Sequence, residues 1–389
     1  MRSGNIRPMT KLLYLVTEAD YFFSHRYALA KAAQQQGYEV SVATVPGTHR
    51  QRLLDEGFRL YPLTKMTRAG LHPLKQFLSF LEIYKIYRTE KPDMVHHVAM
   101  KPVLYGTLAA RLAGVKCVVN ALTGLGYLFI SPSVKAKFLR FWVWTSFRFL
   151  FKGPKCVLIL QNKDDFQLFS KTVPPQNLAL IRGSGVDIKH FSPPPKKKDH
   201  KRLKVVLVAR LLWDKGIREA IEVVRLLKEK GFSFEFILAG GLDLQNPSGI
   251  PRHIVEQWQQ QGLCTWMGKV DDVAKLYQAC DIAVLPSYRE GLPKSLLEAA
   301  ACGLPIVTTD VPGCREIVED GKTGLLVPVR TVGPLTEALG RLLTDAPLRK
   351  KLGHNARTSV EKNFSSEKII KETVAVYEVL EPRVGVKRK

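Results

Sequence analysis

Short apolar segments alternate with helical segments along the whole chain. In the first half, β-branched and other apolar residues gather at 11–17, 39–45, 94–100, 117–122, 157–160 and 178–182. Helix-like spacing fills the intervals, as at 24–36 and 102–113. Strands that alternate with helices in this way are typical of parallel sheets in α/β proteins. We therefore expect the first half to form one parallel sheet covered by helices.

The same alternation starts again after a segment rich in proline and lysine. Residues 193–202 cannot continue a packed element, and we interpret them as a linker. Further strands are predicted at 203–210, 234–241, 264–268, 281–286 and 305–310. Helices are predicted at 216–230, 250–261, 271–279, after Pro293, and at 365–380. The second half is therefore expected to repeat the architecture of the first.

The chain length fits this division, because 389 residues are too many for a single core. The prediction is an α/β protein with two doubly wound, Rossmann-like sheets that face each other across a cleft. The domains are placed at 10–192 and 203–364, joined by the linker 193–202. Residues 365–380 are predicted to form a last helix, which we expect to cross back to the first domain.

Composition excludes several classes of protein. Hydrophobic residues make up 46% of the chain, which argues against disorder, and no apolar run approaches the ~20 residues of a spanning helix. The N-terminal apolar run is interrupted by Glu18 and Asp20, so it indicates a first strand and not an export signal. The six cysteines have no metal-ligand spacing and are expected to be buried thiols in a reducing cytosol, without a structural zinc site.

The charge is distributed unevenly. Residues 1–200 contain 30 Lys and Arg against 12 Asp and Glu, whereas residues 201–389 contain 29 against 23. Between Met94 and Lys163 there are ten basic residues and no acidic one. A positive field of this kind attracts phosphates of nucleic acid, of an anionic lipid leaflet or of a lipid pyrophosphate. Charge alone does not choose among them.

The segment 286–303 carries the most specific chemistry. Glu290 lies in a glycine loop, and Glu298 lies about two turns into the helix that follows Pro293. Lys294 falls in the first helical turn, where a cation opposes the helix dipole unless an anion binds there. This arrangement describes a nucleotide-sugar site, in which one carboxylate binds sugar hydroxyls, the other binds a ribose, and a phosphate lies between them. The alternative is a surface helix with an ordinary N-terminus.

An ordered set of motifs extends this interpretation to the whole second half. It comprises SGVDIKHFSP (184–193), ARLLWDKG (209–216), ILAGG (237–241), MGKVDDVAKLY (267–277), the segment 286–310 and PGCREIVEDGKTGLLVPV (312–329). The chain resembles the retaining, metal-independent nucleotide-sugar glycosyltransferases of family 4. That resemblance implies the GT-B fold, with an acceptor-binding first domain and a nucleotide-sugar-binding second domain. ARLLWDKG, the loop 240–250 and GLGYLFI (124–130) are most similar to transferases that add N-acetylgalactosamine to undecaprenyl-pyrophosphate-linked bacillosamine.

The resemblance assigns the donor side residue by residue. Arg210 and Lys215 would hold the donor diphosphate and offset the charge of the leaving group. Glu298 would bind the ribose hydroxyls, and Glu290 would bind the donor sugar. Further donor contacts are expected from Gly240, Gly241, Gly268, Gly291, Leu292, Pro293 and Lys294. No Asp-x-Asp pair for a divalent ion is present, so no metal or other cofactor is expected and the UDP-sugar is a substrate.

The first half matches the family less well. Glu18 to Arg26 occupy a loop where many relatives have a glycine pair, and Thr123-Gly124 stands where many have a histidine. His25 and Arg26 follow the first strand and are candidates for an acceptor pyrophosphate, with capping or surface roles as the alternative. Thr123 is a further acceptor-side candidate. His96 and His97 end a strand and point to opposite faces, so one could reach the cleft while the other stays in the core.

Two segments bear on the membrane. Residues 138–151 contain seven aromatic residues and two arginines, which suits a helix lying in a lipid interface. Residues 73–88 have apolar side chains at 74, 77, 78, 81 and 84, and we interpret this stripe as the core-facing side of an ordinary helix. The protein is thus expected in the cytoplasm, bound peripherally to the anionic inner face of the cytoplasmic membrane.

The leading hypothesis is a transferase that moves an N-acetylhexosamine from a UDP-sugar to a polyprenyl-pyrophosphate-linked glycan. Retention would proceed by front-face attack, with the leaving phosphate helping to deprotonate the acceptor. The alternatives are a basic nucleic-acid-binding protein and a transferase-like partner without activity. Nucleic acid is not expected as a partner, because the aromatic residues form one apolar block and no reader motif is present.

Overall fold

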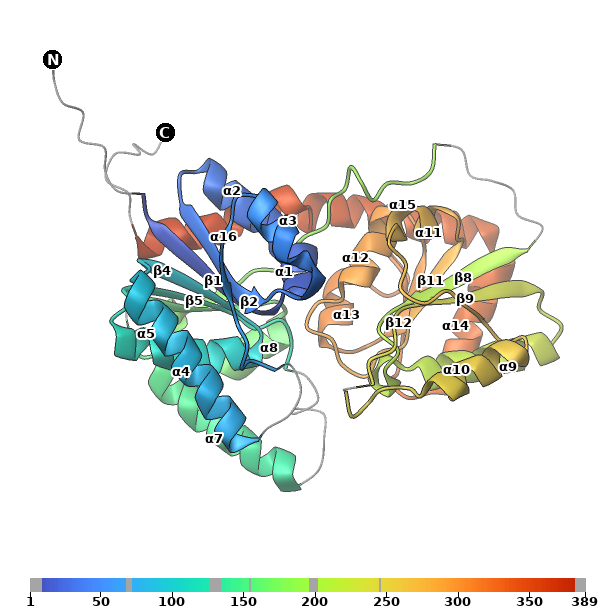
Figure 1. The fold of residues 1–389 in the computed structure, drawn as a ribbon. Coiled ribbons are helices and arrows are strands. Elements are labelled where there is room, and N and C mark those ends of the chain that lie inside the picture. The colour runs from blue at the N-terminus through green and yellow to red at the C-terminus, as the bar shows by residue number, and fades with distance from the viewer. Residues whose placement is uncertain are drawn as a thin grey trace, which may run out of the picture. The chain divides into compact units, whose positions relative to one another are not determined.

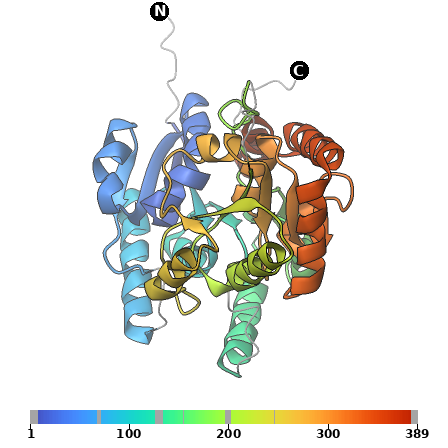
Figure 2. The ribbon, with the colours of Figure 1, turned by 90° about the vertical axis from the view of Figure 1, so that its right-hand side faces the viewer.

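A computed structural model describes residues 9–67, 72–125, 134–153, 155–195, 202–244 and 246–381. The chain forms two compact units, one of Met1–Ser184 with Ile369–Lys389, the other of Gly185–Lys368. Each unit contains one parallel sheet with helices on its faces (Figures 1 and 2). The predicted α/β class with two doubly wound sheets is confirmed.

The first unit contains a seven-stranded sheet with the order β3-β2-β1-β4-β5-β6-β7. Every adjacent pair is parallel. Its strands are β1 (Lys11–Glu18), β2 (Glu39–Val45), β3 (Arg59–Pro62), β4 (Met94–Val98), β5 (Cys117–Ala121), β6 (Cys156–Leu160) and β7 (Leu178–Leu180). The strand β3 was not predicted, because it is a short edge strand with only intermediate burial at its centre. The predicted linker and the motif GLGYLFI lie partly outside the described residues.

Alternation along the strands divides the core of this unit into two layers. Leu12 and Tyr14 of β1 face one layer, and Leu13 and Leu15 face the other. The first layer is covered by α1 (Ala19–His25), α2 (Tyr27–Gln35), α3 (Arg50–Asp55) and α16 (Ser366–Leu380). The second is covered by α4 (Pro73–Glu90), α5 (Thr107–Ala113), α7 (Val134–Leu150) and α8 (Lys163–Ser170), with the π-helix η2 (Pro102–Gly106) before α5. Short 3₁₀ turns are η1 (Gly47–His49) and η3 (Pro175–Asn177).

The second unit contains a six-stranded parallel sheet with the order β10-β9-β8-β11-β12-β13. Its strands are β8 (Leu203–Val208), β9 (Phe234–Ala239), β10 (Thr265–Trp266), β11 (Ile282–Leu285), β12 (Ile306–Thr309) and β13 (Leu325–Val327). Its helices are η4 (Trp213–Lys215), α9 (Ile217–Glu229), α10 (Arg252–Gln260), α11 (Val273–Gln278), α12 (Lys294–Ala301), α13 (Pro312–Ile317), α14 (Val332–Thr344) and α15 (Ala346–Asn363). Among the strands that the structure describes in this unit, only β13 was not predicted. Because the strands are parallel, their carboxyl ends meet at one edge, where ligands of such sheets bind.

The orientation of α4 corrects the sequence analysis. The stripe predicted to face the core points outwards over its first two turns, where Leu74, Phe77, Leu78 and Leu81 are all exposed. A second apolar face of the same helix, with Ile83 at its centre, packs on the sheet instead. Period-3.6 spacing predicted the helix but could not decide which of its two faces lies inwards.

The aromatic segment 138–151 lies in α7 and continues to Phe151. Phe147 and Phe151 are fully buried in the second core layer. Phe141 and Phe149 are 63% and 58% exposed. The segment therefore has a core face as well as an outer one. Of the helices that the structure describes, none combines the length and apolar character that crossing a bilayer requires.

All six cysteines are buried and carry free thiols. They lie in strands, helices and the segments next to them, from Cys117 at the start of β5 to Cys314 in α13. Their burial confirms the expectation of core thiols.

Candidate nucleotide-sugar site

The segment after β8 brings two basic residues to the carboxyl edge of the second sheet. Arg210 lies two residues beyond the end of the strand, and Lys215 ends the 3₁₀ turn η4. Gly216 then caps the start of α9 with a φ of +68°, and a Cβ atom there would lie 1.9 Å from the carbonyl oxygen of Pro286. Only glycine fits such a close approach at that φ. This contact fixes the turn against the end of β11.

Lys215 and Glu290 form a shielded ion pair. The Nζ atom of Lys215 lies 2.5 Å from Oε1 of Glu290, and the two side chains are 19% and 11% exposed. The loop of Glu290 is held by the Asp214 carbonyl, which accepts hydrogen bonds from the Tyr288 N–H and the Ser287 hydroxyl. Two residues placed together by the sequence prediction are thus neighbours, although 75 positions separate them.

Arg210 pairs with a residue that the sequence analysis did not select. Its Nη1 atom donates to Oδ2 of Asp243 at 2.6 Å, and Arg210 is 51% exposed. Asp243 follows the glycine pair at the end of β9. Its position just beyond the motif ILAGG is the feature of the sequence that could have identified it as a site residue. The guanidinium keeps other N–H donors for a phosphate, which binds Arg in a planar fork.

Glycines bring the loops after β8, β9 and β10 together. Gly240 has a φ of +154°, and a Cβ atom there would lie 1.7 Å from the carbonyl oxygen of Ala209. Its N–H donates to the carbonyl of Gly268, and Gly241 accepts from the N–H of Leu211. Three predicted donor glycines therefore build the backbone of this edge.

Glu298 lies inside α12, behind the loop of Glu290. Pro293 is the N-cap of this helix, and Gly303 follows its end with a φ of +75°. Burial raises the pKa of the Glu298 carboxyl, and the ammonium of Lys294 partly opposes this shift. The two side chains form an ion pair at 3.3 Å. A buried carboxylate with one cation retains acceptor capacity for hydroxyl groups.

Gly291 and Leu292 bridge the two glutamates. The N–H of Gly313 in α13 donates to the carbonyl of Glu290, and a Cβ atom on Gly313 would lie 2.4 Å from the Gly291 carbonyl oxygen. Leu292 is buried in the core of the unit. The loop between the two glutamates is thus packed against α13 and the core of the unit, and this packing holds the glutamates in fixed positions.

In the first unit, His25 and Arg26 lie at the end of α1. The His25 ring stacks on Tyr21 at 4.0 Å, and its Nδ1 lies 2.7 Å from the Ser24 hydroxyl. Arg26 is only 5% exposed and donates from Nη1 to the His25 carbonyl, while its Nε atom has no hydrogen-bond partner among the described residues. Thr123 follows β5 and hydrogen-bonds to Tyr21. A buried guanidinium with an unused donor favours an anionic ligand.

His96 and His97 are both buried, on opposite faces of β4. His97 bonds through Nε2 to the hydroxyl of Tyr87 and through Nδ1 to the side chain of Asn120. These bonds leave no ring nitrogen of His97 for a ligand. His96 bonds through Nδ1 to the hydroxyl of Tyr377, and burial holds the pKa of His96 well below its ordinary value.

No metal site is found in the parts of the chain that the structure describes, where no three His, Cys, Asp or Glu side chains gather suitably. The predicted donor residues and Asp243 instead combine three cations, three carboxylates and backbone amides at one sheet edge. Such a set can bind a diphosphate through the cations and hydroxyl groups through the carboxylates.

Comparisons with known proteins give a consistent result. The profile of the glycosyl transferases group 1 matches residues 189–359, and that of the glycosyl transferase 4-like proteins matches residues 11–161. An N,N'-diacetylbacillosaminyl-diphospho-undecaprenol alpha-1,3-N-acetylgalactosaminyltransferase of Campylobacter jejuni is 30% identical over 86% of this chain and 89% of its own length. A UDP-Gal:alpha-D-GlcNAc-diphosphoundecaprenol alpha-1,3-galactosyltransferase of Escherichia coli is 26% identical over 83% and 84%.

Solved structures share the fold over almost the whole chain. A sucrose-phosphate synthase of Thermosynechococcus elongatus superposes with a TM-score of 0.79 at 19% identity, covering 95% of this chain and 99% of that one. The Anabaena protein HepE, solved in complex with UDP and glucose, superposes with a TM-score of 0.75 at 18% identity, covering 95% and 100%. At these identities the likeness concerns the fold.

Proposed function

Because this chain belongs to the glycosyl transferases group 1 and is a glycosyltransferase of the GT-B type, we propose which sugar and acceptor it uses. It transfers an N-acetylhexosamine, N-acetylgalactosamine or N-acetylglucosamine, from a UDP-sugar to a saccharide linked to polyprenyl pyrophosphate. The C. jejuni relative, by its name, transfers N-acetylgalactosamine to such an acceptor. The product would serve surface-polysaccharide, O-antigen or glycoprotein glycan assembly.

The observation that carries the donor assignment is the Lys215–Glu290 pair beside Arg210 and Glu298. In this proposal the diphosphate of the donor binds the guanidinium of Arg210 and the ammonium of Lys215. Glu290 stays beside Lys215 and accepts hydrogen bonds from the sugar hydroxyls. Glu298 accepts hydrogen bonds from the ribose, and Lys294 limits the cost of keeping that carboxylate charged.

The chemistry follows from the charges at this edge. As the bond between sugar and phosphate breaks, negative charge grows on the leaving diphosphate, and two fixed cations stabilise it. We propose that Arg210, Lys215 and the amides around Gly291 replace the divalent ion used by other transferases. The anomeric configuration is retained, with front-face attack by the acceptor hydroxyl and deprotonation assisted by the leaving phosphate.

The acceptor side is assigned to the first unit. Arg26, with its unused Nε donor, is proposed to bind the acceptor pyrophosphate, helped by His25 and Thr123. His96 is a weaker candidate through its unbonded Nε2 atom, and His97 is assigned to the core. The enzyme is proposed to work in the cytoplasm, bound peripherally to an anionic membrane surface.

A donor screen followed by a transfer assay tests this function. The melting temperature is measured with UDP-N-acetylgalactosamine, UDP-N-acetylglucosamine, UDP-galactose and UDP-glucose. The stabilising sugar is then offered with a polyprenyl-pyrophosphate-linked amino sugar, with and without a chelator. Stabilisation by a UDP-N-acetylhexosamine and transfer that survives the chelator are expected. Transfer only after magnesium or manganese is restored would refute the metal-free site, and stabilisation by no UDP-sugar would refute the donor.

A further inference from the structure

Helix α4 has two apolar faces, and only one is used by the core. Ile83 and Tyr87 point into the sheet layer and are 0% and 1% exposed. The opposite face is open to solvent, with exposed fractions between 38% and 60%. It consists of Leu74, Phe77, Leu78 and Leu81. Their spacing of three and four positions puts them on one side of two turns.

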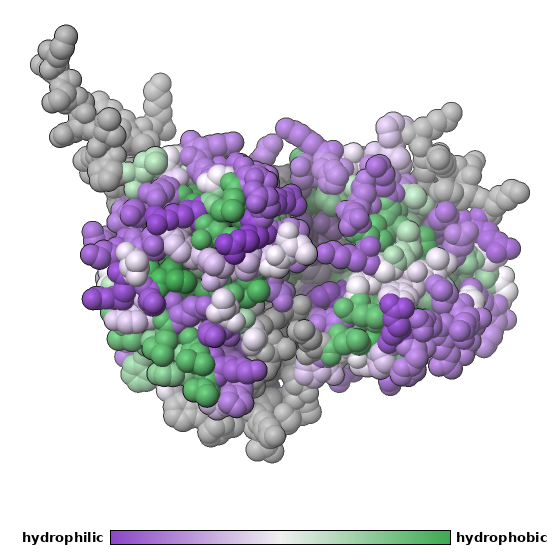
Figure 3. All heavy atoms as spheres, viewed as in Figure 1, coloured by the Kyte–Doolittle hydropathy of each residue, from purple (hydrophilic) through white to green (hydrophobic). Residues whose placement is uncertain are grey.

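Helix α5, which contacts α4, extends this surface. Leu108 and Leu112 lie one turn apart and are 42% and 58% exposed. The six leucine and phenylalanine side chains of the two helices are called the α4–α5 patch below. Figure 3 shows hydrophobic side chains gathered at the lower left of the molecule, over these helices. A contiguous exposed apolar surface of this kind marks an interaction site more often than a scattered one does.

The charges around the patch are basic. The outward stripe of α4 continues from Leu81 to Lys85 and Arg88, and Arg111 lies between the two leucines of α5; all three basic residues are exposed. The acids of α4 are engaged elsewhere in the unit. Glu82 accepts from the backbone N–H groups of Thr64 and Lys65, and Glu90 pairs with Arg59. The surface therefore presents apolar and positive groups together.

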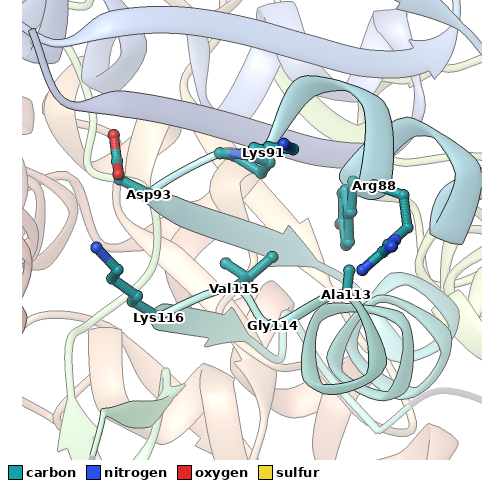
Figure 4. Close-up of a pocket in the computed structure, with 9 residues that line it drawn as sticks. Arg88, Lys91, Asp93, Ala113, Gly114, Val115 and Lys116 are labelled. Carbon is teal, nitrogen blue, oxygen red and sulfur yellow. The ribbon is translucent and has the colours of Figure 1, made fainter.

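A hollow lies at the basic end of the same helix pair. It has a volume of about 270 Å³ and is enclosed by the ends of α4 and α5. Arg88, Lys91 and Lys116 line it, together with Asp93, whose carboxylate accepts the N–H of Lys11 at 3.0 Å (Figure 4). This hollow is at the amino-terminal ends of β4 and β5, the edge opposite to the one where ligands of such sheets bind. It adds positive charge beside the patch.

We propose that the α4–α5 patch docks the enzyme on an anionic lipid bilayer. The leucines and Phe77 enter the boundary between head groups and acyl chains, while Lys85, Arg88 and Arg111 lie among the lipid phosphates. A second copy of the chain fits less well, because a symmetric contact repeats the same patch and would bring basic residues from both copies together. This docking rests on the proposed function, because an enzyme with a lipid-linked acceptor has to reach the membrane surface.

Vesicle binding tests the proposal without any transfer step. The double variant Phe77→Gln/Leu81→Gln is compared with the wild-type chain by co-sedimentation with vesicles of phosphatidylglycerol and phosphatidylcholine. Loss of two inserted side chains is expected to weaken partitioning at least about tenfold. Both positions are exposed, so the variant is expected to keep the wild-type melting temperature.

A matched control uses exposed apolar residues on the other face of the same sheet. Leu54→Gln/Val379→Gln changes α3 and α16, where these side chains are 46% and 69% exposed. It is expected to bind vesicles like the wild type. Donor binding, measured as the melting shift with UDP-N-acetylgalactosamine, serves as the separate readout of the proposed function and should be the same for all variants.

A charge variant identifies the lipid. Lys85→Gln/Arg88→Gln is expected to weaken binding to the anionic vesicles at low salt, and phosphatidylcholine vesicles alone should bind the wild type weakly. Equal vesicle binding by Phe77→Gln/Leu81→Gln and wild type would overturn the proposal. The proposal would also be overturned if the wild-type chain did not bind vesicles but dimerised through Phe77 and Leu81, because the patch would then bind a second copy.

Discussion

At the residue scale, the proposed donor site depends on how well each ion pair is shielded from water. Lys215 and Glu290 are the least exposed of the three pairs at this edge, whereas Arg210 is half exposed. A shielded cation interacts more strongly with a diphosphate, because less water screens the charge. Lys215 should therefore matter more to the reaction than its single charge suggests.

Replacing Lys215 with alanine should lower turnover at least ~100-fold, because the leaving diphosphate loses a preorganised cation that stabilises its negative charge. The measurement is the initial rate of transfer with saturating UDP-sugar. Lys275→Ala is the matched control, since Lys275 is 81% exposed and pairs with Asp272 on the surface. A wild-type rate for Lys215→Ala would remove this residue from the site.

Glu298→Gln should stabilise the fold at neutral pH while weakening donor binding. Burial raises the pKa of Glu298 above its ordinary 4.5 in the folded chain. As the pH rises, the unfolded chain therefore loses this proton at a lower pH than the folded chain does. Stability is then lost as pH rises from 4.5 through the raised folded pKa, and glutamine abolishes that loss. The melting temperature should rise at neutral pH and should not rise below pH 4.5. An equal rise at both pH values would show that the pKa shift is not the cause.

The residue types at the site could be predicted, but one of their partners could not. Arg210, Lys215, Glu290 and Glu298 stand in motifs whose spacing along strand ends implies a common edge. Asp243 was missed because its contact with Arg210 depends on how the glycine loops after β8 and β9 approach each other. Sequence spacing contains no such distance.

At the element scale, the parallel strands were predictable because each is a short buried apolar run between helices. The strand β3 was missed because none of its residues is fully buried, and β13 because its three residues lie between Gly324 and Pro328, which indicate a loop. The helix α4 was predicted, but its orientation was wrong, because a second apolar face with Ile83 and Tyr87 packs on the sheet instead. Which face meets the sheet is decided by packing against α5 and β4, not by the period of the helix.

The turn between β8 and α9 gives an element-scale prediction. Gly216→Ala adds a methyl group beside the Pro286 carbonyl at a φ of +68° and should destabilise the fold by about 3 kcal/mol. Gly231→Ala is the control, because its φ is +85° and no atom lies within 4 Å of the added Cβ atom. That control should cost about 1 kcal/mol, the conformational part alone. Denaturant unfolding gives both values, and equal costs would mean that the close approach is not rigid.

At the scale of the whole molecule, the chain leaves the first unit at Ser184 and returns to it at Ile369. The last helix, α16, completes the first core layer with Ile369, Val374 and Leu380. Its Tyr377 hydroxyl lies 2.9 Å from the hydroxyl of Tyr14 and 2.5 Å from Nδ1 of His96. The end of the chain is thus part of the unit in which the chain begins.

Tyr377→Phe should therefore destabilise the first unit selectively. The ring still fills its space, but buried groups of Tyr14 and His96 lose their partner, which should cost about 1–3 kcal/mol. Val379→Ala, in the same helix but 69% exposed, should change stability by less than about 0.5 kcal/mol. Amide hydrogen exchange locates the effect, since β1 and β4 should exchange faster in Tyr377→Phe while β8 keeps its protection. Faster exchange in β8 as well would mean that the two units unfold together. The loss of one buried hydroxyl in the first unit would then also destabilise the unit that contains the proposed donor site.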